Sequence, residues 1–228
     1  MRMMRRWFCK GLLLPAVAMC SLFVPLSAAH AAFVSYSFSG GVSGISGALL
    51  APAMNMTSPV NGTFQFDNGI SGSMGNYPGA VTAFSVTIGG YTSSFAPGAN
   101  AVTISQNVSL GGGLFGDRWK LVSAATGPQD LQGNGYRPVS FDLQMDREGG
   151  GLFANTDLGQ APSLSALTAN RWRLVFENTD GNLVTVRGAI NSLTAVPLPA
   201  AVILFGAGLI SLVGLGAGGL RNLRGSRA

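Results

Sequence analysis

Histidine and cysteine are almost missing from this sequence of 228 residues. It has one histidine and two cysteines, and all three lie near the N-terminus, as His30, Cys9 and Cys20. Residues 32–195, which we call the body, contain neither residue type. This excludes a Ser-His-Asp or Cys-His nucleophile, an ordinary zinc site and a disulfide from the body. We therefore predict a non-enzymatic protein with no cofactor, whose body depends on its hydrophobic core for stability.

Charged residues are also scarce, at 10% of the sequence, and the two signs are distributed unevenly. The body holds seven basic and nine acidic residues, so the net charge of +5 on the whole chain arises from its two ends. A nucleic-acid-binding surface requires clustered Lys and Arg, and the body sequence has no such run. We expect no nucleic-acid partner and interpret the basic ends as signals of membrane topology.

The N-terminal segment, 1–31, has the three parts of a secretory signal peptide. The positively charged start consists of Arg2, Arg5, Arg6 and Lys10. A mostly apolar stretch follows at 11–26, and Ala29 and Ala31 then frame a small-x-small cleavage pattern before Ala32. This predicts export and a mature chain that starts near Ala32. An uncleaved N-terminal anchor and a lipoprotein attached at Cys20 are the alternatives, and the residues favour them less.

The C-terminal end predicts a membrane span. Residues 200–220 form an apolar run in which Ser211 is the one clearly polar side chain. As a helix, this run reaches roughly 30 Å, the thickness of the hydrocarbon core of a bilayer. Positive residues resist translocation, and the run is followed by Arg221, Arg224 and Arg227 within the basic tail 221–228. The tail should stay cytoplasmic, and the body should lie outside the inner membrane.

A proline motif stands immediately before this span, formed by Val196, Pro197, Leu198, Pro199 and Ala200. Each proline fixes φ and disfavours helix in the residue before it, so the span helix should not run back into the body. Motif, span and basic tail together resemble the PEP-CTERM sorting signal, and most closely its VPLPA variant. Leu198 stands where the common pattern has Glu. The resemblance implies recognition by an exosortase, a membrane-embedded processing enzyme of Gram-negative bacteria that make exopolysaccharide.

The body itself predicts β-structure. Glycine is abundant along it, and apolar side chains alternate with polar ones at 34–38, 81–90 and 137–143. A period of two indicates half-buried strands, and no stretch shows a convincing helical period beyond one or two turns at 161–170. Eight to ten short strands favour one antiparallel β-sandwich, jelly-roll-like or immunoglobulin-like, with a barrel as the alternative. The body of this chain resembles the β-rich domains that are often attached to PEP-CTERM tails.

A β-hairpin is the clearest unit in the body. Residues 171–190 alternate about a turn at Asp180-Gly181, a pair that tolerates the positive φ of tight hairpins. Trp172 alternates with arginines along the first strand, and Trp119 alternates with charged residues in an earlier strand. Both tryptophans are therefore predicted to face the core.

Few residues suggest chemistry. Asp142, Asp146 and Glu148 could offer oxygen ligands to Ca²⁺, although their spacing favours a solvated loop. Tyr77 and Tyr136 lie in turns and could stack on sugars. The Gly-x-Gly-x-x-Gly match at 111–116 precedes a predicted strand, so it indicates a turn and not a dinucleotide site. For glycoside hydrolysis, the sequence alone does not show two carboxylates at the required separation.

Taken together, these features predict an exported surface or extracellular-matrix protein without catalytic activity. Its expected partners are an exosortase-like enzyme, the membrane through the C-terminal helix, and an exopolysaccharide or biofilm matrix. The alternative from another class is a secreted carbohydrate-binding module or carbohydrate-active enzyme. A cleft lined by tyrosine and paired carboxylates would favour that alternative.

Overall fold

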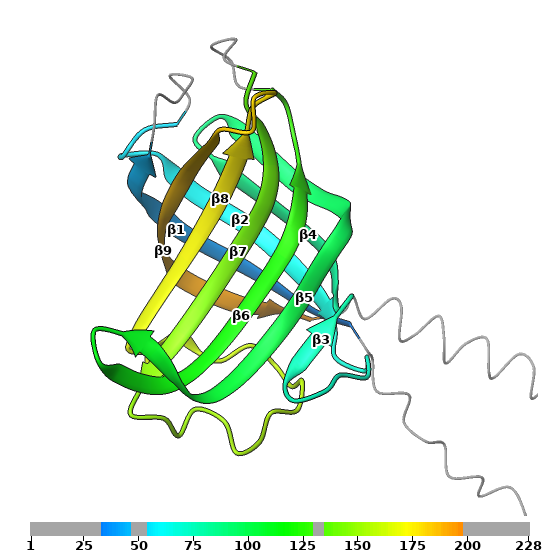
Figure 1. The fold of residues 1–228 in the computed structure, drawn as a ribbon, viewed down its shortest axis with the longest axis vertical. Helices are drawn as coiled ribbons and strands as arrows, with labels where there is room; N and C mark the ends of the chain where they lie inside the picture. Colours follow the sequence, from blue (N-terminus) through cyan, green and yellow to red (C-terminus); the bar gives the residue numbers. More distant parts are fainter. Residues whose placement is uncertain (1–32, 47–53, 130–134, 198–228) are drawn as a thin grey trace, which may run out of the picture. The chain divides into compact units, whose positions relative to one another are not determined.

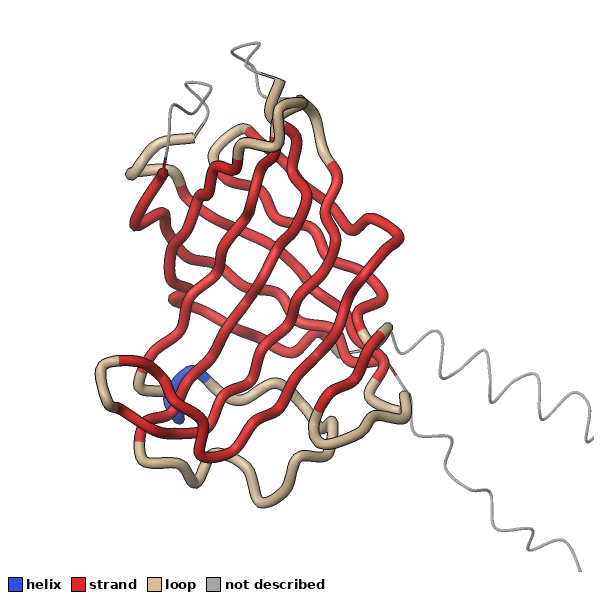
Figure 2. Tube along the Cα trace, in the orientation of Figure 1, coloured by secondary structure: helices blue, strands red, loops and turns tan. Residues whose placement is uncertain are grey.

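The computed structural model describes residues 33–46, 54–129 and 135–197, which contain nine strands and one short 3-10 helix (Figure 1). The strands are β1 (Phe33–Ser46), β2 (Pro59–Asp67), β3 (Asn76–Pro78), β4 (Val81–Ile88), β5 (Tyr91–Gly111), β6 (Leu114–Thr126), β7 (Arg137–Glu148), β8 (Ala169–Glu177) and β9 (Leu183–Val196). The helix, η1 (Leu164–Ala166), lies in the loop between β7 and β8 (Figure 2). No helix within these ranges is long and apolar enough to cross a membrane.

The strands form a closed antiparallel barrel, so the prediction of a β-sandwich is wrong. The order β5-β4-β2-β1-β9-β8-β7-β6 returns to β5 through the β5–β6 pairing, and β3 adds to β5 as an extra strand. The first and last strands of the barrel pair with each other, from Ser35 opposite Val196 to Ser46 opposite Thr185. Closure leaves none of the eight barrel strands as a free sheet edge.

Long, bent strands allow this closure. β5 pairs with β4 over Tyr91–Ser94 and then with β6 and β3, and its register shifts between Phe95 and Asn100. β1 shifts register against β9 at two places. Such bulges bend a strand and increase its twist, which is what curls a sheet into a barrel.

The apolar side chains of the alternating pattern predicted from the sequence face the barrel interior. Trp119 and Trp172 are both 0% exposed, which confirms their predicted position in the core. Aromatic rings stack inside the barrel, with centroids 5.1 Å apart for Tyr36 and Phe64 on neighbouring strands and 5.0 Å apart for Phe84 and Phe141 across the interior. An eight-stranded barrel has an interior just wide enough for side chains to fill, and these rings fill it.

Both predicted turns are present. β8 and β9 form the expected hairpin, in which Gly181 has φ +79° and its N–H donates to the Asn178 carbonyl at 3.1 Å. Gly111 to Gly113 form the tip of the β5–β6 hairpin with φ of 99°, 61° and 81°. The glycine-rich match is therefore a turn between strands, as predicted, and the helix that a dinucleotide site needs does not follow it.

The two ends of the described body leave the barrel side by side. Ser35 near the start of β1 is paired with Val196 at the end of β9, where Pro197 follows and the strand stops. Figure 1 shows both ends departing at the lower end of the barrel. The predicted signal peptide with Ala29, Ala31 and Ala32, the motif residues Leu198, Pro199 and Ala200, the 200–220 span and the tail with Arg221, Arg224 and Arg227 lie outside the described residues.

Candidate functional site

The lower end of the barrel is closed by the β7–β8 loop (149–168). The buried carboxylate of Asp117, 3% exposed, accepts backbone N–H groups of Leu152 at 2.8 Å, Phe153 at 3.4 Å and Asn107 at 3.1 Å. Leu158 in the same loop is buried in the core cluster. A carboxylate with three donors is a well-satisfied buried charge, so we assign Asp117 a structural role.

Two tyrosine hydroxyls hold the same loop. The Tyr36 hydroxyl accepts the Ala161 N–H at 3.0 Å, and the Tyr77 hydroxyl donates to the Thr156 carbonyl at 2.7 Å. Burial raises the pKa of Tyr36, and the hydrogen bond from Ala161 offsets part of that rise. Tyr77 is only 8% exposed, so its ring is not free to stack on a sugar as the sequence suggested.

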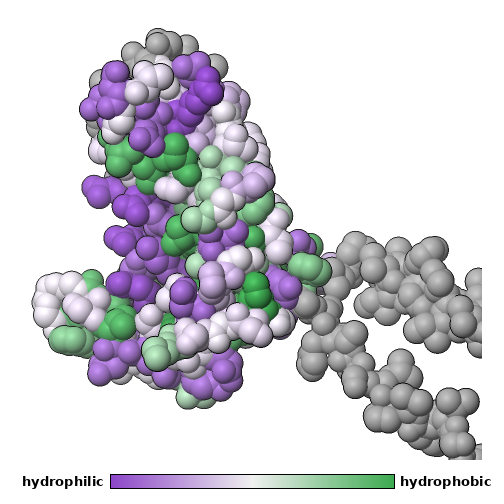
Figure 3. All heavy atoms as spheres, turned by 45° about the vertical axis from the view of Figure 1, so that its right-hand side comes forward, coloured by the Kyte–Doolittle hydropathy of each residue, from purple (hydrophilic) through white to green (hydrophobic). Residues whose placement is uncertain are grey.

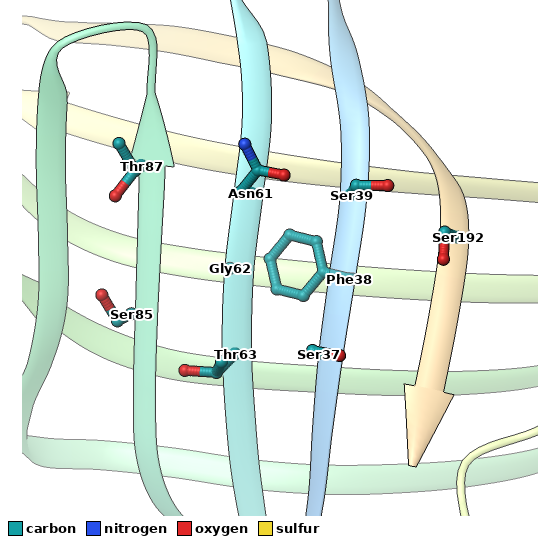
Figure 4. A pocket seen from close by; sticks show the side chains of 9 residues that line it. All are labelled: Ser37, Phe38, Ser39, Asn61, Gly62, Thr63, Ser85, Thr87 and Ser192. Atoms are coloured by element: carbon teal, nitrogen blue, oxygen red, sulfur yellow. The ribbon is translucent and has the colours of Figure 1, made fainter. Parts of the chain in front are cut away.

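Outside the barrel, two surfaces differ sharply in chemistry. The first, the hydroxyl face, covers β1, β2, β4 and the end of β9 (Figure 4). Its outward side chains are Ser37, Ser39, Asn61, Thr63, Ser85, Thr87 and Ser192, which line a shallow depression of about 450 Å³ around Gly62. Beneath it the Phe38 ring, 4% exposed, packs inward against Phe64 and Phe141.

Strand geometry turns the hydroxyl face into a regular array. Outward side chains recur about every 6.8 Å along a strand and about 4.8 Å between strands. All of them are uncharged, and each offers a hydroxyl or an amide that can donate and accept hydrogen bonds. This surface can therefore bind a neutral polar polymer through several weak hydrogen bonds, and it has no titratable group to act as acid or base.

The second surface, the charged face, covers β6, β7 and β8. Arg118 forms a two-bond ion pair with Asp146, with Nε–Oδ1 at 2.8 Å and Nη2–Oδ2 at 3.2 Å. Gln144 donates to Asp146 at 2.7 Å and accepts from Arg171 at 2.7 Å, which continues the row to β8. In Figure 3 hydrophilic residues gather on the left of the view, above the projecting β5–β6 hairpin.

The three calcium candidates do not form a metal site. Asp142, 2% exposed, accepts Arg173 Nε at 2.7 Å, and Asp146 is paired with Arg118. Glu148 lies at the end of β7 and is exposed. Among the described residues no three His, Cys, Asp or Glu side chains are placed to hold a metal ion together. Asp142 and Asp146 thus form ion pairs with arginines, and not the calcium site that the spacing of the acidic residues suggested.

Nor do the described residues combine tyrosine with paired free carboxylates in a cleft. Tyr77 is bonded to the loop, and Tyr136 packs half-buried against the core. The two most buried carboxylates, Asp117 and Asp142, serve backbone N–H groups and an arginine. These tyrosines and carboxylates therefore serve the fold, and none of the clefts described here brings them together.

The sequence pattern identifies some of these residues as outward or polar, but not which of them lie side by side. The alternation of Ser35, Ser37 and Ser39 against Tyr36 and Phe38 already indicates an outward polar row. It does not indicate that Asn61, Thr63, Ser85 and Thr87 lie beside that row, because this depends on the pairing of β1, β2 and β4. Asp117 carried no signal in the sequence, since its partners in the β7–β8 loop are backbone groups far along the chain.

Comparison with known proteins adds no identification. A scan against protein-family models and searches of curated proteins and of solved structures find no match to this chain.

Proposed function

We propose that this is an exported, non-enzymatic surface or matrix protein, sorted by an exosortase-like system and associated with exopolysaccharide. The observation that carries the proposal is the pairing of Ser35 with Val196, which places both ends of the body at one end of the barrel. A barrel attached to a membrane through either end of its chain would have its side surfaces free for a partner. The proline motif begins where β9 ends, so the segment offered to a processing enzyme would follow directly after the last strand.

The hydroxyl face is the proposed contact with the polysaccharide. Sugar hydroxyls and the side chains of Asn61, Thr63 and Thr87 can exchange hydrogen bonds without any charge being buried. A neutral hydrogen bond contributes only about 0.5–1.5 kcal/mol net. The protein would therefore be retained by repeated contacts along the polysaccharide rather than by tight binding of one sugar.

Cosedimentation of the exported protein with the exopolysaccharide of its host tests this proposal. The double variant Asn61→Ala/Thr63→Val removes hydrogen-bonding groups from the hydroxyl face, and Thr126→Val changes an exposed threonine at the end of β6. We expect the double variant to bind about tenfold more weakly, since two hydrogen bonds at about 0.7 kcal/mol each are lost. The control should bind as the wild type does.

Three results would contradict the proposal. The wild-type protein would fail to cosediment, the double variant would be retained as well as the control, or the polymer would release new reducing ends. The last result would identify a glycan-cleaving enzyme instead.

A further inference from the structure

Three arginines gather around a cleft at the edge of the charged face. Arg171 and Arg173 point outward from β8, and Arg187 points outward from β9. With Ser43, Ser46, Thr185, Trp172 and Gly188 they line a cleft of about 290 Å³ where the end of β1 meets β9. This volume is at the lower end of the range of ligand pockets, so the cleft suits a ligand of monosaccharide size.

Arg173 and Arg187 lie directly opposite each other in the β8–β9 register. Side chains so placed have Cβ atoms about 4.5–5.5 Å apart, and like charges in this position destabilise a sheet. Arg173 is compensated by Asp142 of β7, at 2.7 Å. Within the described residues Arg187 makes no hydrogen bond or ion pair, and Arg171 has only the neutral Gln144 as its acceptor. The cleft therefore holds more positive charge than its carboxylates balance.

The Arg187 side chain lies over Gly44 beside the cleft. Gly44 of β1 is its partner in the β1–β9 register, and a Cβ on Gly44 would lie 2.7 Å from Arg187 Nε. The side chain thus extends over Gly44, toward β1, while Arg173 is drawn toward β7. The missing side chain at Gly44 makes room for a guanidinium beside the cleft.

We propose that this cleft binds a small hydroxylated carboxylate, of the class of a uronic acid. The carboxylate would accept hydrogen bonds from the Arg187 guanidinium, whose planar fork of donors matches the two oxygens of a carboxylate. Ser43 and Thr185 offer hydroxyls. The Ser46 hydroxyl is already paired with the Thr185 backbone, since it accepts the Thr185 N–H at 3.1 Å and donates to the Thr185 carbonyl at 3.5 Å. The inference does not rest on the hydroxyl face, because the two surfaces have no residue in common.

Titration of the exported full chain, in mild detergent, with glucuronate, glucose, inorganic phosphate and sulfate tests the site. We expect binding of glucuronate that weakens as salt is added. Arg187→Gln should weaken it at least about tenfold, because a hydrogen bond to a charged group is lost. Arg137→Gln, which removes an exposed arginine elsewhere on β7, should leave it unchanged.

Two further readouts separate a binding site from a structural role. Without ligand, Arg187→Gln should melt at the same temperature as the wild type or higher, since a repulsive pair is removed. Gly44→Ala should weaken binding with all charges kept, because the new methyl displaces the guanidinium. Arg173 is unsuitable as a test, since its loss would leave Asp142 buried without its partner.

The site would be refuted if glucuronate did not bind, or if Arg187→Gln bound it as tightly as Arg137→Gln does. If glucose bound as tightly as glucuronate, the carboxylate of the ligand would not contribute to binding. Binding of phosphate or sulfate without glucuronate would show that the ligand class is wrong. A lower melting temperature of ligand-free Arg187→Gln would show that Arg187 stabilises the fold, and would also overturn the proposal.

Discussion

Single buried side chains carry much of the stability of this barrel, and Trp172 is the most direct case. Its indole is 0% exposed, and it lies opposite Gly188 across β8 and β9. Trp172→Ala should lower the free energy of unfolding by about 3–5 kcal/mol, because the lost side chain leaves a large cavity. Urea unfolding followed by circular dichroism measures the change. Leu183→Ala, at a position 63% exposed in the same hairpin, should change it by less than about 0.5 kcal/mol. Equal stabilities of the two variants would show that Trp172 is not in the core.

Two glycines in neighbouring strands should respond oppositely to the same substitution. A Cβ on Gly62 would clash with the Phe38 ring and lie 2.6 Å from the Ser85 carbonyl oxygen, whereas a Cβ on Gly41 meets nothing within 4 Å. Gly62→Ala should therefore destabilise the barrel by about 1–3 kcal/mol. Gly41→Ala should be neutral or stabilising by up to about 1 kcal/mol, because the unfolded chain loses freedom. Thermal melts of both variants decide this, and a stable Gly62→Ala would mean that Phe38 does not pack over Gly62.

At the scale of the elements, the β7–β8 loop is tied to the barrel by Asp117 of β6. Asp117→Ala would leave the Leu152, Phe153 and Asn107 N–H groups without their acceptor, at a cost on the order of 2–3 kcal/mol. We expect faster chymotrypsin cleavage after Leu152 and Phe153, identified by mass spectrometry. Asp157→Ala is the matched control, since the hydrogen bonds of Asp157 lie within its own loop. Equal cleavage in both variants would contradict the tethering role.

In the proposed sorting route, the segment after β9 is the element that the exosortase-like enzyme would recognise. Val196 ends the last strand and Pro197 follows it, so the proline motif starts at the edge of the folded body. Changing Pro197 and Pro199 to Ala should leave membrane insertion intact but slow processing, because the segment becomes free to form helix. Pulse-chase labelling of the host follows the uncut form. Processing at the wild-type rate would show that the prolines are not part of the recognised motif.

At the scale of the whole molecule, local alternation predicts strands but not the closure of the sheet. The inward residues of the 171–190 hairpin, such as Trp172, Leu174 and Val186, would face the core of a sandwich or of a barrel alike. The deciding contact, between Ser35 and Val196, joins strands at opposite ends of the body. The bend in β5 at Phe95–Asn100 also depends on its three neighbouring strands. The Ser35–Val196 pairing has no local sequence pattern, and Pro97-Gly98 within β5 indicates a bend but not the strands that pair on either side of it.

The same limit applies to the sites. The outward arginines of β8 are evident from alternation, but Arg187 is placed opposite Arg173 by the β8–β9 register. Asp142 and Asp146 were candidate calcium ligands because the sequence does not show their ion-pair partners, Arg173 and Arg118, which lie on other strands. The sequence thus predicts which charged side chains point outward, but the pairing of the strands determines which of them form ion pairs.

Mass spectrometry of the intact protein recovered from its host tests the central claim, that a barrel body is exported and released from a sorting tail. We predict a mature chain that begins near Ala32 and ends between residues 195 and 200. This result would place both cuts at the edges of the strands that pair Ser35 with Val196, β1 and β9. Chains that end at Ala228 in every fraction, with the exosortase-like enzyme present, would contradict the account and show that the tail is a permanent anchor.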